Sequence, residues 1–372
     1  MLCCTLAALD ANAPKVEPGG RQAHSGRMFG RPRSARPRPL ALGFWLLVVA
    51  ALVFAIVVVG GITRLTESGL SITEWKPIRG VIPPLDDVDW QAEFAGYKAI
   101  PQYRAFNAHM TLEGFKHIYF WEYLHRLLAR GIGTVLGIVL LVFWWRRWIP
   151  AGYGWRTLLI LALGGLQGVI GWWMVASGLQ YRTEVSHIRL ATHLIAALLI
   201  YSVLIWTALD LLTLGGRRAR LRAGPACAIL ALVIQLILGA FTAGLRAGYA
   251  FASWPKMGDD WFPQGGWMSG ESIVHNLVSN PIVVQFVHRW WAWVVALAAV
   301  LLAQRVWRAG EARAAVAVVL LVALQIGLGI ATLLSGVDLH VAVTHQAVAA
   351  LLLAAMVWAA HAVGHARPGR LR

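Results

Sequence analysis

The segment RLATHLIAALLIY at residues 189–201 has a counterpart later in the chain, VAVTHQAVAALLL at residues 341–353. Two further pairs of segments match in the same order. They are GGITRLTESGLSITEWKP (60–77) with LGAFTAGLRAGYAFASWPK (238–256), and EYLHR (122–126) with QFVHR (285–289). Matched segments in a fixed order indicate an internal duplication. The sequence therefore predicts two halves of similar architecture, with four helices in each.

The composition excludes a soluble globular protein. Of the 372 residues, 58% are hydrophobic and 13% are charged, whereas a soluble domain has about 25% charged residues. The mean hydropathy is +0.62. Crossing about 30 Å of hydrocarbon takes roughly 20 apolar residues, and eight stretches qualify: Leu42–Gly60, Ile118–Trp145, Leu158–Ser177, His187–Leu212, Ala226–Gly244, Ile282–Trp307, Ala314–Ser335 and His340–Val363. We predict an all-α polytopic membrane protein whose eight transmembrane helices form two pseudo-symmetric four-helix bundles.

The duplication sets the expected domain boundaries. Residues 1–40 form a disordered basic tail, for which a removable transit peptide and a start at Met28 stay open. Residues 41–215 form the first bundle, with a long outer loop at 62–117. Residues 216–366 form the second bundle, with an outer loop at 245–281, and residues 367–372 form a cytoplasmic tail. The only cysteines, Cys3, Cys4 and Cys227, provide neither a disulfide framework nor a metal cluster.

The formal charge of +16 is distributed by loop, which argues against nucleic-acid binding. Arginines concentrate in both termini and in every second connection, including Arg146, Arg147 and Arg217–Arg222. This is the positive-inside pattern of eight spans with both termini in the cytoplasm. The intervening loops hold most of the acidic residues and should face the periplasm. We expect a multi-pass protein of a bacterial inner membrane, with the lipid bilayer as its surroundings.

Four histidines occupy matched positions in the two halves: His125, His193, His288 and His345. Each lies six or seven residues inside the outer end of its span, about 10 Å below the interface. In an up-and-down bundle, the second and fourth helices face each other across a diagonal of about 11–14 Å. That gap accommodates a flat macrocycle between two imidazoles whose nitrogens lie about 2 Å from the metal. The spacing predicts one bis-histidine haem site in each half, near the periplasmic face.

Other histidines of the sequence compete with these four as candidate ligands. A single histidine inside a span is more often a hydrogen-bonded packing residue than a ligand, but four at equivalent depth favour ligation. His187 and His340 are the rivals, and we expect both to be solvated at helix mouths. His361 and His365 lie at the inner end of the last span, with no counterpart on the sixth span. A cytochrome that carries electrons across the membrane would hold two haems on one pair of helices, one near each face. The sequence therefore disfavours this class of protein.

The motifs EYLHRLLARGIG, HIRLATHLIAALLIY, FVHRWW and THQAVAALLL, together with GGITRLTESGLSITEWKP, resemble the haem A synthase family in its alphaproteobacterial and mitochondrial form. The resemblance covers Leu42 to Val363, and the chain lacks the outer-loop cysteine pair of another form of the family. It implies that the C8 methyl of haem O is oxidised to a formyl group by two successive hydroxylations, giving haem A. It also implies substrate haem between His125 and His193 and a haem b between His288 and His345.

Three further residues are candidates for chemistry or haem binding. Glu122 lies three positions before His125, on the same helical face, whereas the second half has Gln285 there. A carboxyl group inside a span is a functional candidate, so we expect Glu122 to accept a proton or stabilise positive charge; a helix N-terminal charge is the alternative. Arg126 and Arg289 each follow a candidate ligand. We expect them to bind haem propionates, and snorkelling to the interface is the alternative.

Three classes of function remain open at this point. The first is an oxidoreductase that converts haem O to haem A for terminal oxidases. The second is a di-haem b cytochrome that passes electrons to a quinone pool, and the third is a haem-transfer assembly factor. Expected partners are haem O, haem O synthase and oxidase assembly factors. The sequence identifies no electron acceptor, and a homo-oligomer is left open.

Overall fold

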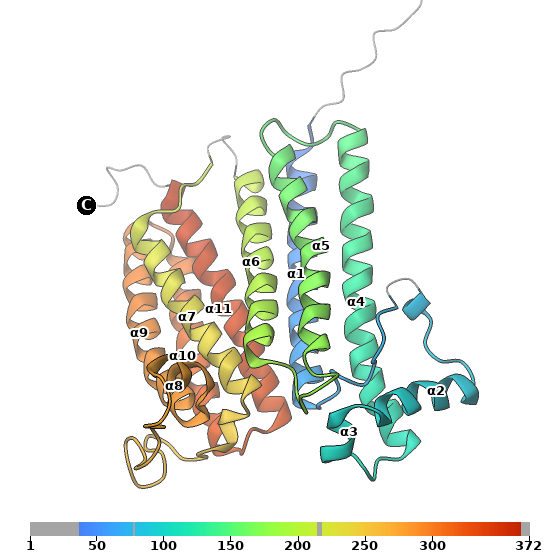
Figure 1. The fold of residues 1–372 in the computed structure, drawn as a ribbon. Coiled ribbons are helices and arrows are strands. Elements are labelled where there is room, and N and C mark those ends of the chain that lie inside the picture. Colours follow the sequence, from blue (N-terminus) through green and yellow to red (C-terminus); the bar gives the residue numbers. More distant parts are fainter. Residues whose placement is uncertain (1–36, 77–78, 214–217, 366–372) are drawn as a thin grey trace, which may run out of the picture. The chain divides into compact units, whose positions relative to one another are not determined.

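A computed structural model describes residues 37–76, 79–213 and 218–365, and all regular secondary structure in these ranges is helical apart from one isolated bridge. Eight helices are long and apolar enough to cross a membrane (Figure 1): α1 (Pro39–Leu65), α4 (Leu112–Trp145), α5 (Gly154–Ala176), α6 (His187–Leu212), α7 (Ala223–Gly244), α9 (Pro281–Arg308), α10 (Ala312–Leu334) and α11 (Leu339–His365). The eight predicted spans and the all-helical membrane fold are confirmed. Most of the predicted basic tail and the whole C-terminal tail lie outside the described residues.

The long helices pack as two closed rings. In the first ring, α1 contacts α4, α4 contacts α5, α5 contacts α6, and α6 returns to α1. In the second ring, α7, α9, α10 and α11 follow one another in the same way. The rings meet where α6 contacts α7 and α11, and where α1 contacts α11. The pseudo-symmetry of the two bundles, and the domain boundaries placed between them, stay predictions.

The diagonals of the two rings differ. Helices α9 and α11 also pack against each other across the second ring, whereas α4 and α6 pack far less closely across the first. Helix α11 is the most buried of the eight, because 61% of an apolar 18-residue stretch of this helix is buried. Helix α6 follows with 50%. The rings therefore share a centre made of α6 and α11, and the first ring has the more open interior.

Helix ends extend past the predicted spans. Helix α1 ends at Leu65 rather than Gly60, and α4 begins at Leu112 rather than Ile118. The added turns are more polar, so hydropathy does not register them, but their backbone hydrogen bonds continue. The Thr111 side chain accepts the Gly114 N–H at 3.2 Å and caps α4. The extra turns stabilise the segments outside the spans.

The first outer segment folds over the start of α4. It contains η1 (Arg79–Val81), α2 (Asp87–Lys98) and α3 (Pro101–Phe106), and Figure 1 shows α2 and α3 around the lower end of α4. Phe94 and Tyr97 of α2 pack against Phe115 of α4, and the Phe94 and Phe115 rings are stacked 4.9 Å apart. Burial raises the pKa of the Tyr97 hydroxyl to about 12. A second, smaller core thus holds this segment at the end of α4 that carries Glu122 and His125.

The second outer segment is held by buried asparagines. It contains η2 (Ala247–Tyr249) and α8 (Ile273–Ser279). The Asn280 side chain accepts the Ile282 N–H at 3.0 Å, which caps α9, and donates to the Gly266 carbonyl at 2.8 Å. Asn276, which is fully buried, donates to the Met268 carbonyl at 3.0 Å. The start of the helix that carries His288 is thereby tied to its outer loop.

Ion pairs join the two rings at this same end. Glu67 and Arg246 are the residues that follow the C-caps of α1 and α7, and both adopt left-handed backbone angles, with φ of 56° and 52°. Their side chains pair with each other, and Arg246 also pairs with Glu184. Glu184 in turn accepts a hydrogen bond from Arg64 Nη2 at 3.1 Å. Equivalent positions of the repeat therefore carry opposite charges and fasten one half to the other.

Candidate functional site

Each of the four candidate ligands lies edge-on against a glycine of a neighbouring helix. A Cβ added at that glycine would lie 3.0–3.1 Å from the imidazole Cε1, closer than the roughly 3.5–4.0 Å of good carbon–carbon contact. A side chain at any of these glycines would require the imidazole to move by a few tenths of an ångström. The four pairs are His125 with Gly60, His193 with Gly171, His288 with Gly239, and His345 with Gly329.

The four contacts have the same arrangement in both rings. The histidines lie on α4 and α6 in the first ring and on α9 and α11 in the second, whereas the glycines lie on the helices between them. The structure therefore places the two histidines of each predicted pair on alternate helices of one ring. Their pairing across a haem stays a prediction.

Three glutamines that were not predicted from the sequence support these histidines. Gln167 donates to the His193 carbonyl at 2.8 Å and lies 3.1 Å from its Nδ1. Gln235 donates to the His288 carbonyl at 2.9 Å, and Gln325 lies 3.4 Å from His345 Nε2. Each glutamine precedes the contacting glycine by four positions, one helical turn. A polar residue inside a span, repeated at this spacing, was the available signal.

The first ring breaks this pattern at one helix. Helix α1 has Ile56 four positions before Gly60, so the His125 backbone lacks the glutamine bond made to His193 and His288. Gln346 of α11 instead donates to the Val57 carbonyl at 2.7 Å, and its side chain fills the space beside Gly61. The support of His125 therefore differs from that of His193 and His288.

The histidines fit a haem. All four are half-buried, and Nδ1 of His125, His288 and His345 is buried without a hydrogen-bond partner among the described residues. An unbonded polar atom in an apolar bundle is costly, and neutral imidazole nitrogens are common iron ligands in haem proteins. The glycines leave room for the imidazole rings beside the neighbouring helices. His125, His193, His288 and His345 are thus the residues that would hold two haems.

Glu122 is buried and saturated with hydrogen bonds. Its side chain is 4% exposed. Oε2 accepts the Ser71 hydroxyl at 2.7 Å and the Ile72 N–H at 2.8 Å. Oε1 accepts both Nε and Nη2 of Arg126, at 3.1 and 2.6 Å. The carboxylate therefore anchors the chain that follows α1 to the turn of α4 that carries His125.

Arg126 and Arg289 hold equivalent stretches of the two outer segments. Arg126 donates to the Ile72 carbonyl at 2.9 Å and to the Glu74 carbonyl at 3.3 Å. Arg289 donates to the carbonyls of Phe251 at 3.0 Å and Ser253 at 2.8 Å. The Nε of Arg289 has no hydrogen-bond partner among the described residues. The predicted propionate contacts stay a prediction, and the observed partners are loop carbonyls.

The rival histidines lie apart from the pairs. His340 is exposed, as expected for a helix mouth. The expectation that His187 is solvated is wrong, because this residue is 7% exposed. Its backbone lies against Gly244, and its ring packs edge-on against Phe241 at 5.6 Å. The approach of α7 to the start of α6 buries it, which the position of a helix end in the sequence does not reveal.

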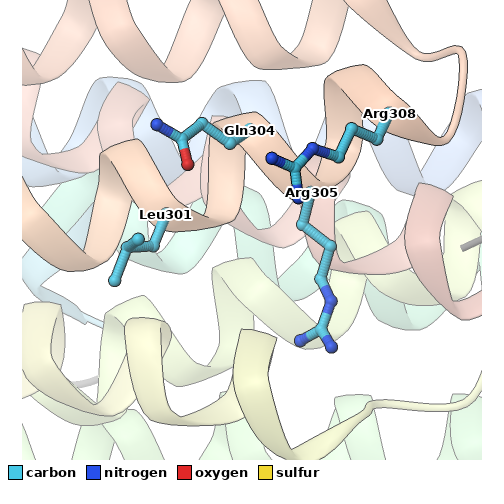
Figure 2. A pocket seen from close by; sticks show the side chains of 4 residues that line it. All are labelled: Leu301, Gln304, Arg305 and Arg308. Atoms are coloured by element: carbon cyan, nitrogen blue, oxygen red, sulfur yellow. The ribbon is translucent and has the colours of Figure 1, made fainter. Parts of the chain in front are cut away.

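A separate hollow lies at the end of α9 remote from His288. It has a volume of about 290 Å³ and is lined by Leu301, Gln304, Arg305 and Arg308 (Figure 2). The Arg305 side chain reaches Gly224 at the start of α7. None of the predicted site residues lines this hollow, so it is not part of the candidate haem sites.

The fold and the paired imidazoles define a multi-pass membrane protein with the donor set of a haem-binding helix bundle. The sequence profile of the COX15-CtaA family, described as cytochrome oxidase assembly protein, matches residues 43–357. The chain belongs to this family, and the resemblance found from its motifs is confirmed.

Several similar proteins are named "Heme A synthase". The protein of Rhizorhabdus wittichii is 66% identical over 338 residues, which cover 90% of this chain and 97% of the relative. That of Sphingopyxis alaskensis is 53% identical, with 88% and 93% covered. That of Caulobacter vibrioides is 48% identical, with 87% and 95% covered.

Replacement of Gly329 by alanine should displace His345, whereas Gly327→Ala, one half-turn away, should not. The new Cβ at 329 lies 3.1 Å from the imidazole Cε1, but nothing lies within 4 Å of a Cβ at 327. Overpacking of this kind costs about 1–3 kcal/mol, so haem retention in the second ring should fall about tenfold or more. Haem-to-protein ratios and low-spin electron paramagnetic resonance of the purified variants measure the effect. Indistinguishable variants would contradict the role of this glycine.

Proposed function

We propose that this protein is a haem A synthase, which oxidises the C8 methyl group of haem O to a formyl group. The observation that carries the proposal is the 66% identity to a protein named "Heme A synthase" over 97% of that protein's length. The two rings support it, because each places two histidines of its spans against glycines of neighbouring helices. The product, haem A, serves the assembly of terminal oxidases.

The two rings take different roles in this proposal. Haem O binds between His125 and His193 as the substrate, and a resident haem b binds between His288 and His345. The looser packing of α4 against α6 suits a substrate that enters and leaves. The carboxylate of Glu122 occurs only in the first ring, since Gln285 takes its place in the second.

The reaction belongs to the oxidoreductases. Two successive hydroxylations of the methyl carbon give a gem-diol, which loses water to leave the formyl group. With the oxygen counted as water, the change from methyl to formyl releases four electrons and four protons, so an electron acceptor is required. The resident haem b supplies a redox-active iron for electron transfer. The chain itself positions the substrate and stabilises charge beside the reacting carbon.

Glu122 acts by stabilising positive charge in this proposal, rather than as a mobile proton acceptor. Both carboxylate oxygens already accept hydrogen bonds, from Ser71, Ile72 and Arg126. Accepting a proton would break at least one of these bonds and release the outer segment from α4.

The two arginines differ in their availability for haem propionates. Arg126 uses its Nε and Nη groups on Glu122 and on two carbonyls. Arg289 keeps its Nε without a hydrogen-bond partner among the described residues. We therefore assign a propionate contact to Arg289 first, whereas Arg126 would share donors with the outer segment.

The orientation and partners follow from the charge pattern and the substrate. Both termini lie in the cytoplasm, and the histidine-bearing ends of the helices face the periplasm of a bacterial inner membrane. Haem O has little aqueous solubility, which favours direct delivery from haem O synthase within the bilayer. Oxidase assembly factors receive the product.

The pigment composition tests the proposal. When the protein is co-expressed with haem O synthase and purified, chromatography of extracted haem should show haem b together with haem O or haem A. Total membrane haem should include haem A only when the chain is present. Haem b alone at two per chain would contradict the proposal and indicate a di-haem cytochrome.

Glu122→Gln should lower haem A formation by about a hundredfold while both haems stay bound. The substitution keeps the side-chain volume and removes the charge, and one well-placed electrostatic contact is worth roughly 10²-fold in rate. The matched control is Glu113→Gln, the same exchange at an exposed carboxylate of α4, which should leave the rate within a few-fold. Haem A per haem b in membranes is the readout. An unaffected Glu122→Gln variant would remove Glu122 from the chemistry.

A further inference from the structure

A second group of metal-binding side chains lies at the opposite end of the bundle from the four histidines. Asp210 is near the end of α6, and His361 and His365 are near the end of α11. Asp210 follows His193 along α6, and His361 follows His345 along α11, by roughly 25 Å at 1.5 Å per residue. The proposed haem chemistry does not use this group, and the sequence analysis found no role for its histidines.

The three donor atoms are close enough to share one ion. Oδ1 of Asp210 lies 3.0 Å from Nε2 of His361 and 3.9 Å from Nε2 of His365. One ligand atom from each residue lies within 4.8 Å of the others. Tetrahedral zinc with bonds of about 2.0–2.2 Å keeps its ligand atoms about 3.4 Å apart. A cation therefore fits between them once the His365 side chain moves closer to the other two ligands.

The surroundings fix the donors before any ion binds. The Asp210 side chain is fully buried, and those of His361 and His365 are 5% and 20% exposed. Trp206 packs edge-on against the His361 ring at 5.1 Å, and the two imidazole rings lie 4.6 Å apart. The histidines are one helical turn apart on α11, so they present their rings on the same face. The partial exposure of His365 leaves an entry route.

Arg156 orients the carboxylate from the other side. Its Nη1 donates to Oδ2 of Asp210 at 2.5 Å, and the Ala219 N–H donates to Oδ1 at 3.0 Å. Oδ1 is therefore the oxygen that faces both imidazoles. Hydrogen bonds of this kind, made to the outer side of a ligand, orient it toward the metal. Arg156 offsets the negative charge of Asp210. Zinc also binds sets of neutral imidazoles, so the site does not need a net negative charge.

We propose that Asp210, His361 and His365 bind a divalent transition-metal cation, with Zn²⁺ the best match to two imidazoles and one carboxylate oxygen. Binding replaces the Oδ1–His361 hydrogen bond with metal–ligand bonds, the neutral His361 ring then carries its proton on Nδ1, and water completes the tetrahedron. The ion is structural. It joins α6 of the first ring to α11 of the second, the two helices that carry His193 and His345.

Zinc stoichiometry tests the proposal on the haem-loaded full chain, purified without a histidine tag. After dialysis against a chelator and then against micromolar Zn²⁺, mass spectrometry of the elements should find one zinc per chain in addition to iron. His365→Gln and His361→Ala should each lower the zinc affinity at least tenfold. The control His275→Gln removes an exposed histidine near the other end of the bundle and should keep the zinc. An unchanged haem spectrum shows that each variant is folded.

Two readouts make the outcome decisive if His361→Ala fails to fold. X-ray absorption at the zinc edge should show two imidazoles and a short zinc–oxygen distance in the wild-type chain. Zinc should raise the melting temperature of the wild-type chain but not that of His365→Gln. Equal zinc binding by the wild-type chain and His365→Gln, or no zinc in either, would overturn the proposal, as would an absorption spectrum without histidine scattering.

Discussion

Each of the four imidazoles lies against a glycine of a neighbouring helix in the same ring. A larger residue at that position would press on the imidazole. In an apolar bundle, a ring that approaches a neighbouring backbone edge-on loses most of its rotational freedom. At His193 and His288, a glutamine on the glycine-bearing helix also bonds the histidine carbonyl, so the main chain and the ring of the ligand are fixed from the same side. This packing orients the imidazoles, and Nδ1 of His125, His288 and His345 has no hydrogen-bond partner among the described residues.

The same helical turns that present the histidines also hold the outer segments. Glu122 and Arg126 flank His125, and together they bond Ser71, Ile72 and Glu74. In the second ring, Gln285 and Arg289 bond the carbonyls of Phe251 and Ser253, at the equivalent place in the repeat. Ligand position and loop position are therefore coupled in both rings. Substitutions in the outer segments should be felt at the haem sites, although no loop side chain needs to touch a haem.

Much of this architecture was predictable from sequence, because eight long apolar runs and four histidines at matched depth are strong local signals. The prediction failed where contacts between distant segments determine the burial or the hydrogen-bond partners of a residue. The burial of His187 depends on the approach of α7, and the loop carbonyls that engage Arg126 and Arg289 are side-chain partners only after the outer segments fold back. Gln167, Gln235 and Gln325 were visible as polar residues in spans, but their bonds to histidine required the ring geometry. The group formed by Asp210 and His361 joins residues distant in sequence.

The central claim is that the four histidines ligate two irons in pairs, His125 with His193 and His288 with His345. Low-spin electron paramagnetic resonance of the purified protein, compared across the four single His→Ala variants, tests it most directly. The account predicts two distinct bis-imidazole signals in the wild-type chain. His125→Ala and His193→Ala should lose the same signal, and His288→Ala and His345→Ala should lose the other. Retention of both signals in any one of the four variants would contradict it.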